Sequence, residues 1–284
     1  SGVLGQKVGM SSMQFLKIMP SARISSLGDA SVALSSGSEA IFFNPASLTE
    51  INGEDMTFNY VDWFMDTYLS AISFGWGISR FSSIGMKLIY NDMGKFEETT
   101  VDMLGFVETD GGGYYNPGIT GREFSARSYL IGLSYAQRLT DKFSFGLTVN
   151  YIYESLYSAK EVKVGDKIYK TYTSSVVFDF GMRYITGFRS VVIGASVQNF
   201  GPDVKFAEEG YPPPMMFRAG VAFNLLGSTS LLFMGGDNLR LTVLFDMFQP
   251  NDYMQQFHAG FEFTYKEVLS LRVGKKFNYD VESW

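Results

Sequence analysis

Residues Phe143 to Tyr153 read FSFGLTVNYIY, and this stretch decides the fold. Large apolar or aromatic side chains occupy every second position, namely Phe143, Phe145, Leu147, Val149, Tyr151 and Tyr153. Small or polar residues stand between and after them, at Ser144, Gly146, Thr148, Asn150 and Glu154. Successive side chains of a β-strand point to opposite faces. The stretch therefore predicts a strand with one apolar face and one polar face.

The same alternation recurs along the chain from about Asp55 onward. In one further segment Val176, Phe178, Phe180, Met182 and Tyr184 alternate with Ser175, Asp179, Gly181 and Arg183, and a second segment runs from Gln256 to Lys266. We expect eleven strands, at about 55–64, 68–78, 81–92, 124–138, 143–157, 174–185, 189–200, 215–225, 239–248, 255–266 and 268–279. The sequence therefore predicts an all-β fold.

The strand lengths and connections indicate a transmembrane barrel. Most strands reach the roughly 9–11 residues that a tilted strand needs to cross a bilayer, whereas strands of soluble proteins average about 5–6. Tight turns at 140–142, 186–187 and 266–267 alternate with long links at about 93–123, 158–173 and 201–214. Short turns at one rim and long loops at the other are typical of antiparallel up-and-down outer-membrane barrels.

The positions of the charges favour a barrel over a soluble β-sandwich. A Lys or Arg on the lipid face at mid-depth would cost roughly 2–4 kcal/mol. The charges in the central parts of the strands all fall on the polar face, which would line the lumen: Lys87, Glu154, Asp179, Arg183, Arg218, Arg240, Asp246, Glu262 and Arg272. We expect Asp179 to pair with Arg183 and Glu262 with Arg272. Such pairs would stabilise the interior or hold a plug, or form a polar track for a substrate headgroup.

Composition excludes several classes of protein. No stretch approaches the roughly 18–20 apolar residues of a spanning helix, although 46% of residues are hydrophobic and 16% aromatic. The absence of cysteine excludes disulfides and thiolate metal sites. A formal charge of −6 without a basic cluster argues against a nucleic-acid partner. Neither a Ser-His-Asp set nor metal-ligand spacing is visible, so we expect no enzyme, no metal and no cofactor, and we interpret the lone His258 as a satisfied lumen residue.

The first fifty residues lack the alternation and mix turn and short-helix signals. We divide the chain into a segment at 1–50, a hatch in or below the lumen or alternatively a periplasmic tail, and a barrel at 51–284. In the hatch, Asn44 and Pro45 are typical of a capped turn, and Asp29 belongs to the same set of candidate structural residues. No signal peptide opens the sequence, so we expect that one has been removed.

The strand count and the loops carry two further expectations. Bacterial single-chain barrels have an even number of strands, so closing strands are expected after Trp284, or one more near Ser228 to Met234. Gly111 to Gly113 lack the Lys-Ser/Thr pair of a phosphate loop. We interpret them as part of an outer loop in which Tyr114 and Tyr115, together with Tyr211 in a second loop, are candidates for contact with a partner.

Three groups of motifs resemble the PorV/PorQ proteins, which belong to the FadL-like outer-membrane barrels. The first comprises QFLKI at 14–18, SAR at 21–23, LGDA at 27–30 and IFFNPASL at 41–48. The second comprises QNFGP at 198–202, KF at 205–206, PP at 213–214 and FRAGV at 217–221. The third comprises QPND at 249–252, LRVG at 271–274 and KFNY at 276–279. The motifs lie in order along most of the chain.

This resemblance implies a fourteen-stranded barrel with an amino-terminal hatch in the bacterial outer membrane, surrounded by lipid and lipopolysaccharide. It also implies two roles. PorV-like members act with the type IX secretion translocon and bind protein cargo, whereas FadL-like relatives carry long-chain fatty acids or other hydrophobic molecules. Ile24-Ser25-Ser26 departs from the glycine- and methionine-rich stretch of many relatives, and both roles stay open.

Overall fold

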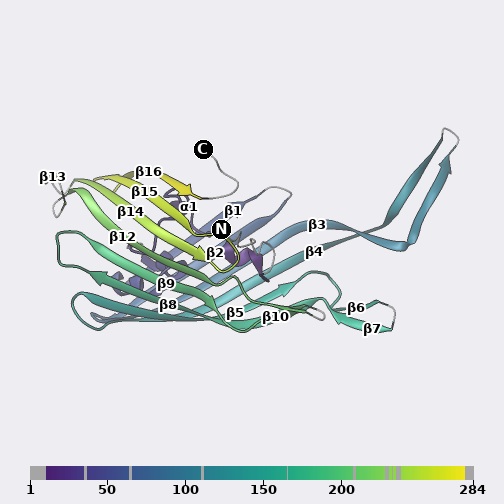
Figure 1. Ribbon diagram of the computed structural model, residues 1–284, viewed down its shortest axis with the longest axis horizontal. Helices are drawn as coiled ribbons and strands as arrows, with labels where there is room; N and C mark the ends of the chain where they lie inside the picture. The colour runs from purple at the N-terminus through teal and green to yellow at the C-terminus, as the bar shows by residue number, and fades with distance from the viewer. Residues whose placement is uncertain are drawn as a thin grey trace, which may run out of the picture.

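A computed structural model describes residues 11–34, 37–63, 66–109, 112–164, 166–206, 209–227, 230–231, 233–234 and 238–278. Its main feature is one large curved antiparallel sheet (Figure 1). Along the sheet the strands follow the order β1 (Glu54–Asp62), β2 (Tyr68–Ser79), β3 (Ser82–Thr109), β4 (Gly112–Arg138), β5 (Phe143–Ser155), β8 (Tyr172–Ile185), β9 (Val192–Phe200), β12 (Met216–Gly227), β14 (Leu239–Pro250), β15 (Gln256–Tyr265) and β16 (Leu269–Phe277). All eleven expected strands are present, and neighbours along the chain pair in an up-and-down meander.

The alternation read from the sequence corresponds to the two faces of this sheet. In β5 every second residue from Ser144 to Glu154 is buried, while Val149 and Tyr151 are exposed. Each strand presents an exposed apolar side chain on its outer face, for example Phe58, Trp76, Met86, Leu133, Tyr151, Phe180, Ile193, Phe217, Phe245, Phe261 and Leu271. An apolar outer face and a buried polar inner face form the inside-out pattern of a barrel in lipid. This pattern confirms the predicted fold class.

The described residues form four short helices, all before β1, which lie against the inner face of the sheet. They are η1 (Gln14–Lys17), α1 (Ala22–Ser25), η2 (Gly37–Phe42) and η3 (Pro45–Glu50). None of the described helices is long and apolar enough to cross a membrane. Ile24, Leu27, Ile41, Phe43 and Leu48 of this segment are buried in one apolar cluster, and the wall contributes Leu69, Ile89, Leu130, Ile152 and Leu244 to it. The inner face therefore contacts the helices through apolar residues and also through polar ones, such as Ser144 and Lys87.

The two rims differ, as the turns and links predicted. Short turns join most of the strands at one end, where the longer link from β12 to β14 also lies. The opposite end carries the β3–β4 extension and two small hairpins, β6 (Glu161–Val164) with β7 (Lys167–Lys170) and β10 (Val204–Phe206) with β11 (Glu209–Tyr211). We call these ends the short-turn rim and the long-loop rim; they lie at the left and right of Figure 1. Near Ser228 to Met234 the described residues form only β13 (Phe233–Met234), which pairs with the end of β12 and does not span the wall.

The prediction of a loop at 93–123 is wrong in part, because most of these residues extend β3 and β4 as a long hairpin (Figure 1). Pairing with β2 ends at Asp92 and pairing with β5 ends at Arg127, so the hairpin continues beyond the wall. The β3–β4 register shifts between Asp92 and Lys95, and twice more between Glu97 and Leu104. A bulge inserts an extra residue and so interrupts the alternation of side chains between the two faces of a strand. Both faces of a two-stranded hairpin outside the wall are also exposed. The alternation that marks the other strands is therefore absent.

Glu98 joins this hairpin to the connection after β5. Its carboxylate accepts hydrogen bonds from the Tyr157 and Thr120 hydroxyls and pairs with Arg122, and Tyr157 packs edge-on against Phe124, with 4.9 Å between ring centroids. The hydrogen bond from Tyr157, followed by that from Thr120, lowers the pKa of Glu98. The contact therefore stabilises the fold at pH values above the pKa that Glu98 has in the unfolded chain. This stabilisation is lost as the pH falls through the lower pKa that Glu98 has in the folded protein.

The substitution Tyr157→Phe removes the main cause of this shift. We therefore expect the pKa of Glu98 to rise toward its ordinary value in the variant, as followed by NMR titration of labelled glutamate carboxyls. Tyr114→Phe, on the same hairpin but away from Glu98, is the matched control. An unchanged Glu98 titration in Tyr157→Phe would contradict this assignment.

Candidate functional site

The candidate site is the interface between the barrel wall and residues 11–50, which we call the hatch. Charged side chains of the wall bind the backbone of the hatch. Asp246 accepts hydrogen bonds from the Ser31 and Val32 N–H groups at 2.6 and 2.9 Å, and Arg218 donates to the Asp29 carbonyl at 3.1 Å. Both wall residues are buried. Buried charges need such partners, so the inward-facing polar side chains hold the hatch in the lumen.

The predicted turn at Asn44 and Pro45 lies at the centre of this interface. Asn44 caps η3 by accepting a hydrogen bond from the Ala46 N–H at 3.1 Å, and Pro45 occupies the first turn. The Asn44 amide also donates to the carbonyls of Val32 and Met182, at 2.6 and 3.0 Å. One side chain therefore shapes the hatch and attaches it to β8.

Asp29, the third residue of the predicted hatch set, has a left-handed backbone with φ of 63°. Its carboxylate pairs with Lys276 of β16 at 2.8 Å. The preceding Leu27 and Gly28 pack directly on Gly274, where a Cβ atom would stand 1.9 Å from the Leu27 carbonyl carbon. The hatch therefore contacts β16 backbone against backbone, and a side chain at Gly274 would displace it.

The structure corrects one expected ion pair and contains the other. Asp179 and Arg183 do not pair with each other; they lie four residues apart on one strand, a separation of roughly 13 Å. Asp179 instead pairs with Lys87 at 2.8 Å, and the Lys87 ammonium also donates to the Ile41 carbonyl of the hatch. Gly132 lies between them and leaves room for the Lys87 side chain. Glu262 does pair with Arg272, at 2.6 Å.

Further hatch charges complete the network. Glu50 of η3 pairs with Arg138 and Arg183 at 2.9 and 3.0 Å. Arg23 of α1 pairs with Glu262 at 2.8 Å, and Lys17 pairs with Asp252. The sequence prediction includes Arg183 and Glu262 but not Arg138, Lys276 or these hatch charges, although the alternation also places Arg138 and Lys276 on the polar face of their strands. That signal could have identified them.

The remaining candidates differ in burial. Glu154 is buried and accepts a hydrogen bond from Ser128 at 3.4 Å, whereas Arg240 is 39% exposed and pairs with Glu267 at the short-turn rim. His258 is buried beside Gln256 and 5.3 Å from the Phe248 ring, and its Nδ1 atom has no hydrogen-bond partner. The described residues contain no cluster of His, Cys, Asp and Glu suited to a metal ion. Tyr114, Tyr115 and Tyr211 are all exposed beyond the long-loop rim.

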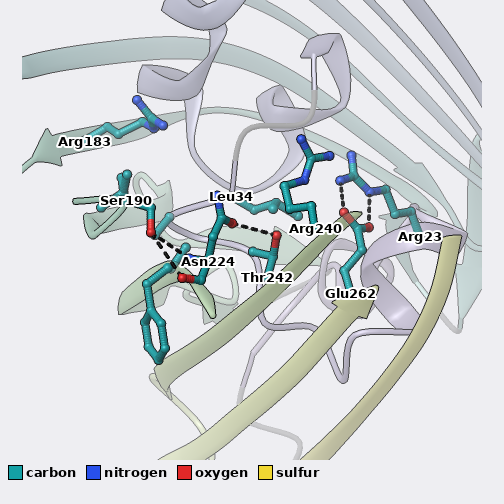
Figure 2. Close-up of a pocket in the computed structure, with 12 residues that line it drawn as sticks. Arg23, Leu34, Arg183, Ser190, Asn224, Arg240, Thr242 and Glu262 are labelled. Atoms are coloured by element: carbon teal, nitrogen blue, oxygen red, sulfur yellow. Dashed lines mark hydrogen bonds and ion pairs between the residues drawn. The ribbon is translucent and has the colours of Figure 1, made fainter. Parts of the chain in front are cut away.

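A cavity of about 280 Å³ lies on the side of the hatch nearer the short-turn rim (Figure 2). Arg23 and Arg183 line it from the hatch and from β8, and Arg240 lines it from β14. Figure 2 also shows Asn224 bonded to Ser190 and to Thr242 across the cavity floor. This inner cavity is polar and basic.

Two cavities lie on the side of the hatch nearer the long-loop rim. The larger, of about 530 Å³, is lined by Phe15, Ile18 and Met19 of the hatch and by Val61, Trp63 and Met93 of the wall, and also by the charged residues Lys17, Asp29 and Lys276. The smaller, of about 210 Å³, lies beside Phe248 and Tyr253 and is also lined by Lys17, Arg218 and His258. The Arg218 guanidinium stacks 4.1 Å from the Phe248 ring centroid. Both outer cavities are lined by aromatic and by charged residues, and the hatch lies between them and the inner cavity.

The described sheet, which begins at β1 and ends at β16, has the architecture of the wall of a β-barrel, and the amino-terminal hatch packs against its inner face. Neither a protein-family model nor a curated protein matches the sequence. Among solved structures, the chain is similar to a TodX deltaS2S3 mutant monoaromatic hydrocarbon channel, with a TM-score of 0.53 and 14% identity over 92% of this chain and 84% of that one. It is also similar to the Pseudomonas putida toluene transporter TodX, with a TM-score of 0.50 and 14% identity over 89% and 82% of the two chains. The chain thus shares the fold of these solved channel structures.

Proposed function

We propose that this protein is a bacterial outer-membrane channel that admits small apolar or aromatic compounds past its hatch. The observation that supports the proposal is the position of the hatch between two cavities. The one at the long-loop rim is lined in part by aromatic and apolar residues, and the one at the short-turn rim is polar. Long loops face the cell exterior in outer-membrane barrels. A compound entering from outside therefore meets Phe15, Ile18 and Trp63 first.

The wall contacts support a hatch that can move as a unit. The inward charges bind it through backbone carbonyl and N–H groups and through ion pairs along its length. The hatch members of these pairs are Lys17, Arg23, Asp29 and Glu50. In this proposal residues 1–50 form the hatch and residues 51–284 form the barrel. The lumen charges then serve as releasable attachments, not as catalytic groups.

Uptake of radiolabelled toluene tests this function, because the similar TodX structures are described as a toluene transporter and a monoaromatic hydrocarbon channel. We expect a bacterial host lacking its own hydrocarbon channels to take up toluene faster when it carries this barrel. Trp63→Glu would place a charge in the larger outer cavity and should reduce this uptake. Asp141→Lys, on a turn at the opposite rim, is the control. Equal uptake with and without the barrel would contradict the proposal.

A second candidate function is a partner-binding component of type IX secretion, as the PorV/PorQ resemblance implies. It is favoured by the exposed aromatic residues beyond the long-loop rim, Tyr114, Tyr115 and Tyr211. Purification from native membranes with stoichiometric translocon or cargo proteins would support this candidate. A solitary barrel would count against it.

A further inference from the structure

We propose that the outer part of the β3–β4 hairpin binds an extended, basic segment of another protein, which adds a strand to the free edge of β3. We call this part the ribbon and define it as Thr99–Thr109 of β3 and Gly112–Gly121 of β4. The inference goes beyond the proposed channel and would stand if the barrel transported no toluene.

The ribbon is a two-stranded sheet without a further neighbour among the described residues. β3 pairs with β2 only as far as Asp92, and β4 pairs with β5 only as far as Arg127. An isolated two-stranded hairpin is marginally stable in water, and three or more strands are the usual minimum. A free strand edge is also a template for another chain. A third strand from a partner would therefore stabilise the ribbon.

Apolar side chains stand on both faces of the ribbon. Phe106 and Tyr115 are register partners on one face and are 64% and 62% exposed. Val107 and Tyr114 are partners on the other face and are also exposed. Exposed apolar patches rimmed by polar residues mark interaction sites. An added strand with alternating apolar side chains would cover these residues.

The two edges of the ribbon are not equivalent. On β4, Pro117 has no N–H group to donate, and the Asn116 side chain already accepts hydrogen bonds from the N–H groups of Gly118 and Ile119. The β3 edge from Leu104 to Glu108 contains no proline. Main-chain hydrogen bonds supply the affinity in strand addition, so the edge of β3 is the binding edge.

Charge selects the class of partner. Residues 99–121 contain Asp102, Glu108 and Asp110 but no Lys or Arg. The two basic residues between Asp92 and Arg127 are Lys95 and Arg122. They lie nearer the wall than the ribbon does and pair with Glu123 and Glu98. Like charge therefore opposes pairing with a second copy of the ribbon or contact with an anionic lipid surface, whereas a basic segment is attracted.

The test uses the whole barrel in detergent and a labelled synthetic peptide that alternates Lys with Val. Its matched control alternates Glu with Val. We expect the Lys–Val peptide to bind at least about tenfold more tightly than the Glu–Val peptide, a difference of about 1.4 kcal/mol. Hydrogen exchange should show new protection at the β3 amides of residues 104–108.

Two variants make the test specific. Asp102→Lys with Glu108→Lys should weaken binding of the Lys–Val peptide, whereas Asp141→Lys at the short-turn rim should leave it unchanged. Replacing residues 99–119 by two glycines should abolish binding and keep the barrel intact, because Thr120 already lies against Glu98, with 2.8 Å between the Thr120 hydroxyl and the carboxylate.

Several results would overturn the inference. These are failure of the Lys–Val peptide to bind, equal binding to the ribbon-deleted barrel, or protection that falls on β4 or elsewhere. Dimers of the barrel that form only when the ribbon is present would instead identify a second copy of this protein as the partner that binds the ribbon. Ribbon-dependent binding to phosphatidylglycerol vesicles would identify a lipid surface.

Discussion

Asp179→Leu is expected to destabilise the barrel by about 3–5 kcal/mol, the cost of leaving one partner of a buried ion pair alone. Asp179 is fully buried, and its carboxylate accepts hydrogen bonds from Lys87 and Asn150 and from the Asn199 N–H, each at 2.8 Å. Without it, the buried Lys87 ammonium keeps only the Ile41 carbonyl at 3.2 Å. The variant would therefore also weaken the attachment of the hatch.

The free energy of unfolding in lipid vesicles, from urea titrations followed by tryptophan fluorescence, measures this effect. Lys87→Met combined with Asp179→Leu should cost less than the sum of the single variants, because neither charge is left buried. Glu267→Gln is the control, since it breaks the exposed pair with Arg240 and should cost less than about 1 kcal/mol. A loss in Asp179→Leu no larger than in Glu267→Gln would contradict this account.

The strands could be predicted from the sequence because lipid and hatch impose opposite chemistry on the two faces of each strand. The alternation from Phe143 to Tyr153 is a local signal, and it survives wherever a strand lies in the wall. It fails in the β3–β4 ribbon, where water surrounds both faces and bulges shift the register. The sequence around ribbon residues such as Phe106 therefore predicts a loop and not a strand.

The site was less predictable because its contacts join distant parts of the chain. The alternation along each strand puts Lys87, Asp179, Arg183, Arg218 and Glu262 on the polar face, and these side chains are buried. It could not supply their partners, since Lys87 reaches Asp179 across two intervening strands through the space left at Gly132. The hatch partners Arg23 and Glu50 lie outside any alternating segment. Only the folded arrangement brings them to the wall.

Locking the hatch to the wall should stop transport. Thr49 of η3 and Ser144 of β5 are buried, with 3.1 Å between their hydroxyl oxygens, and the chain has no cysteine of its own. Thr49→Cys with Ser144→Cys therefore places two thiols close enough for a disulfide between hatch and wall. Ser134→Cys with Thr148→Cys, register partners on β4 and β5, places a disulfide within the wall alone.

The central claim is that compounds pass only when the hatch moves, and the most direct test is toluene uptake by these two variants before and after reduction. We expect the uptake through oxidised Thr49→Cys/Ser144→Cys to fall to that of cells without the barrel and to recover on reduction. The Ser134→Cys/Thr148→Cys barrel should transport equally in both states. Unchanged uptake through the barrel with its hatch locked to the wall would contradict the claim.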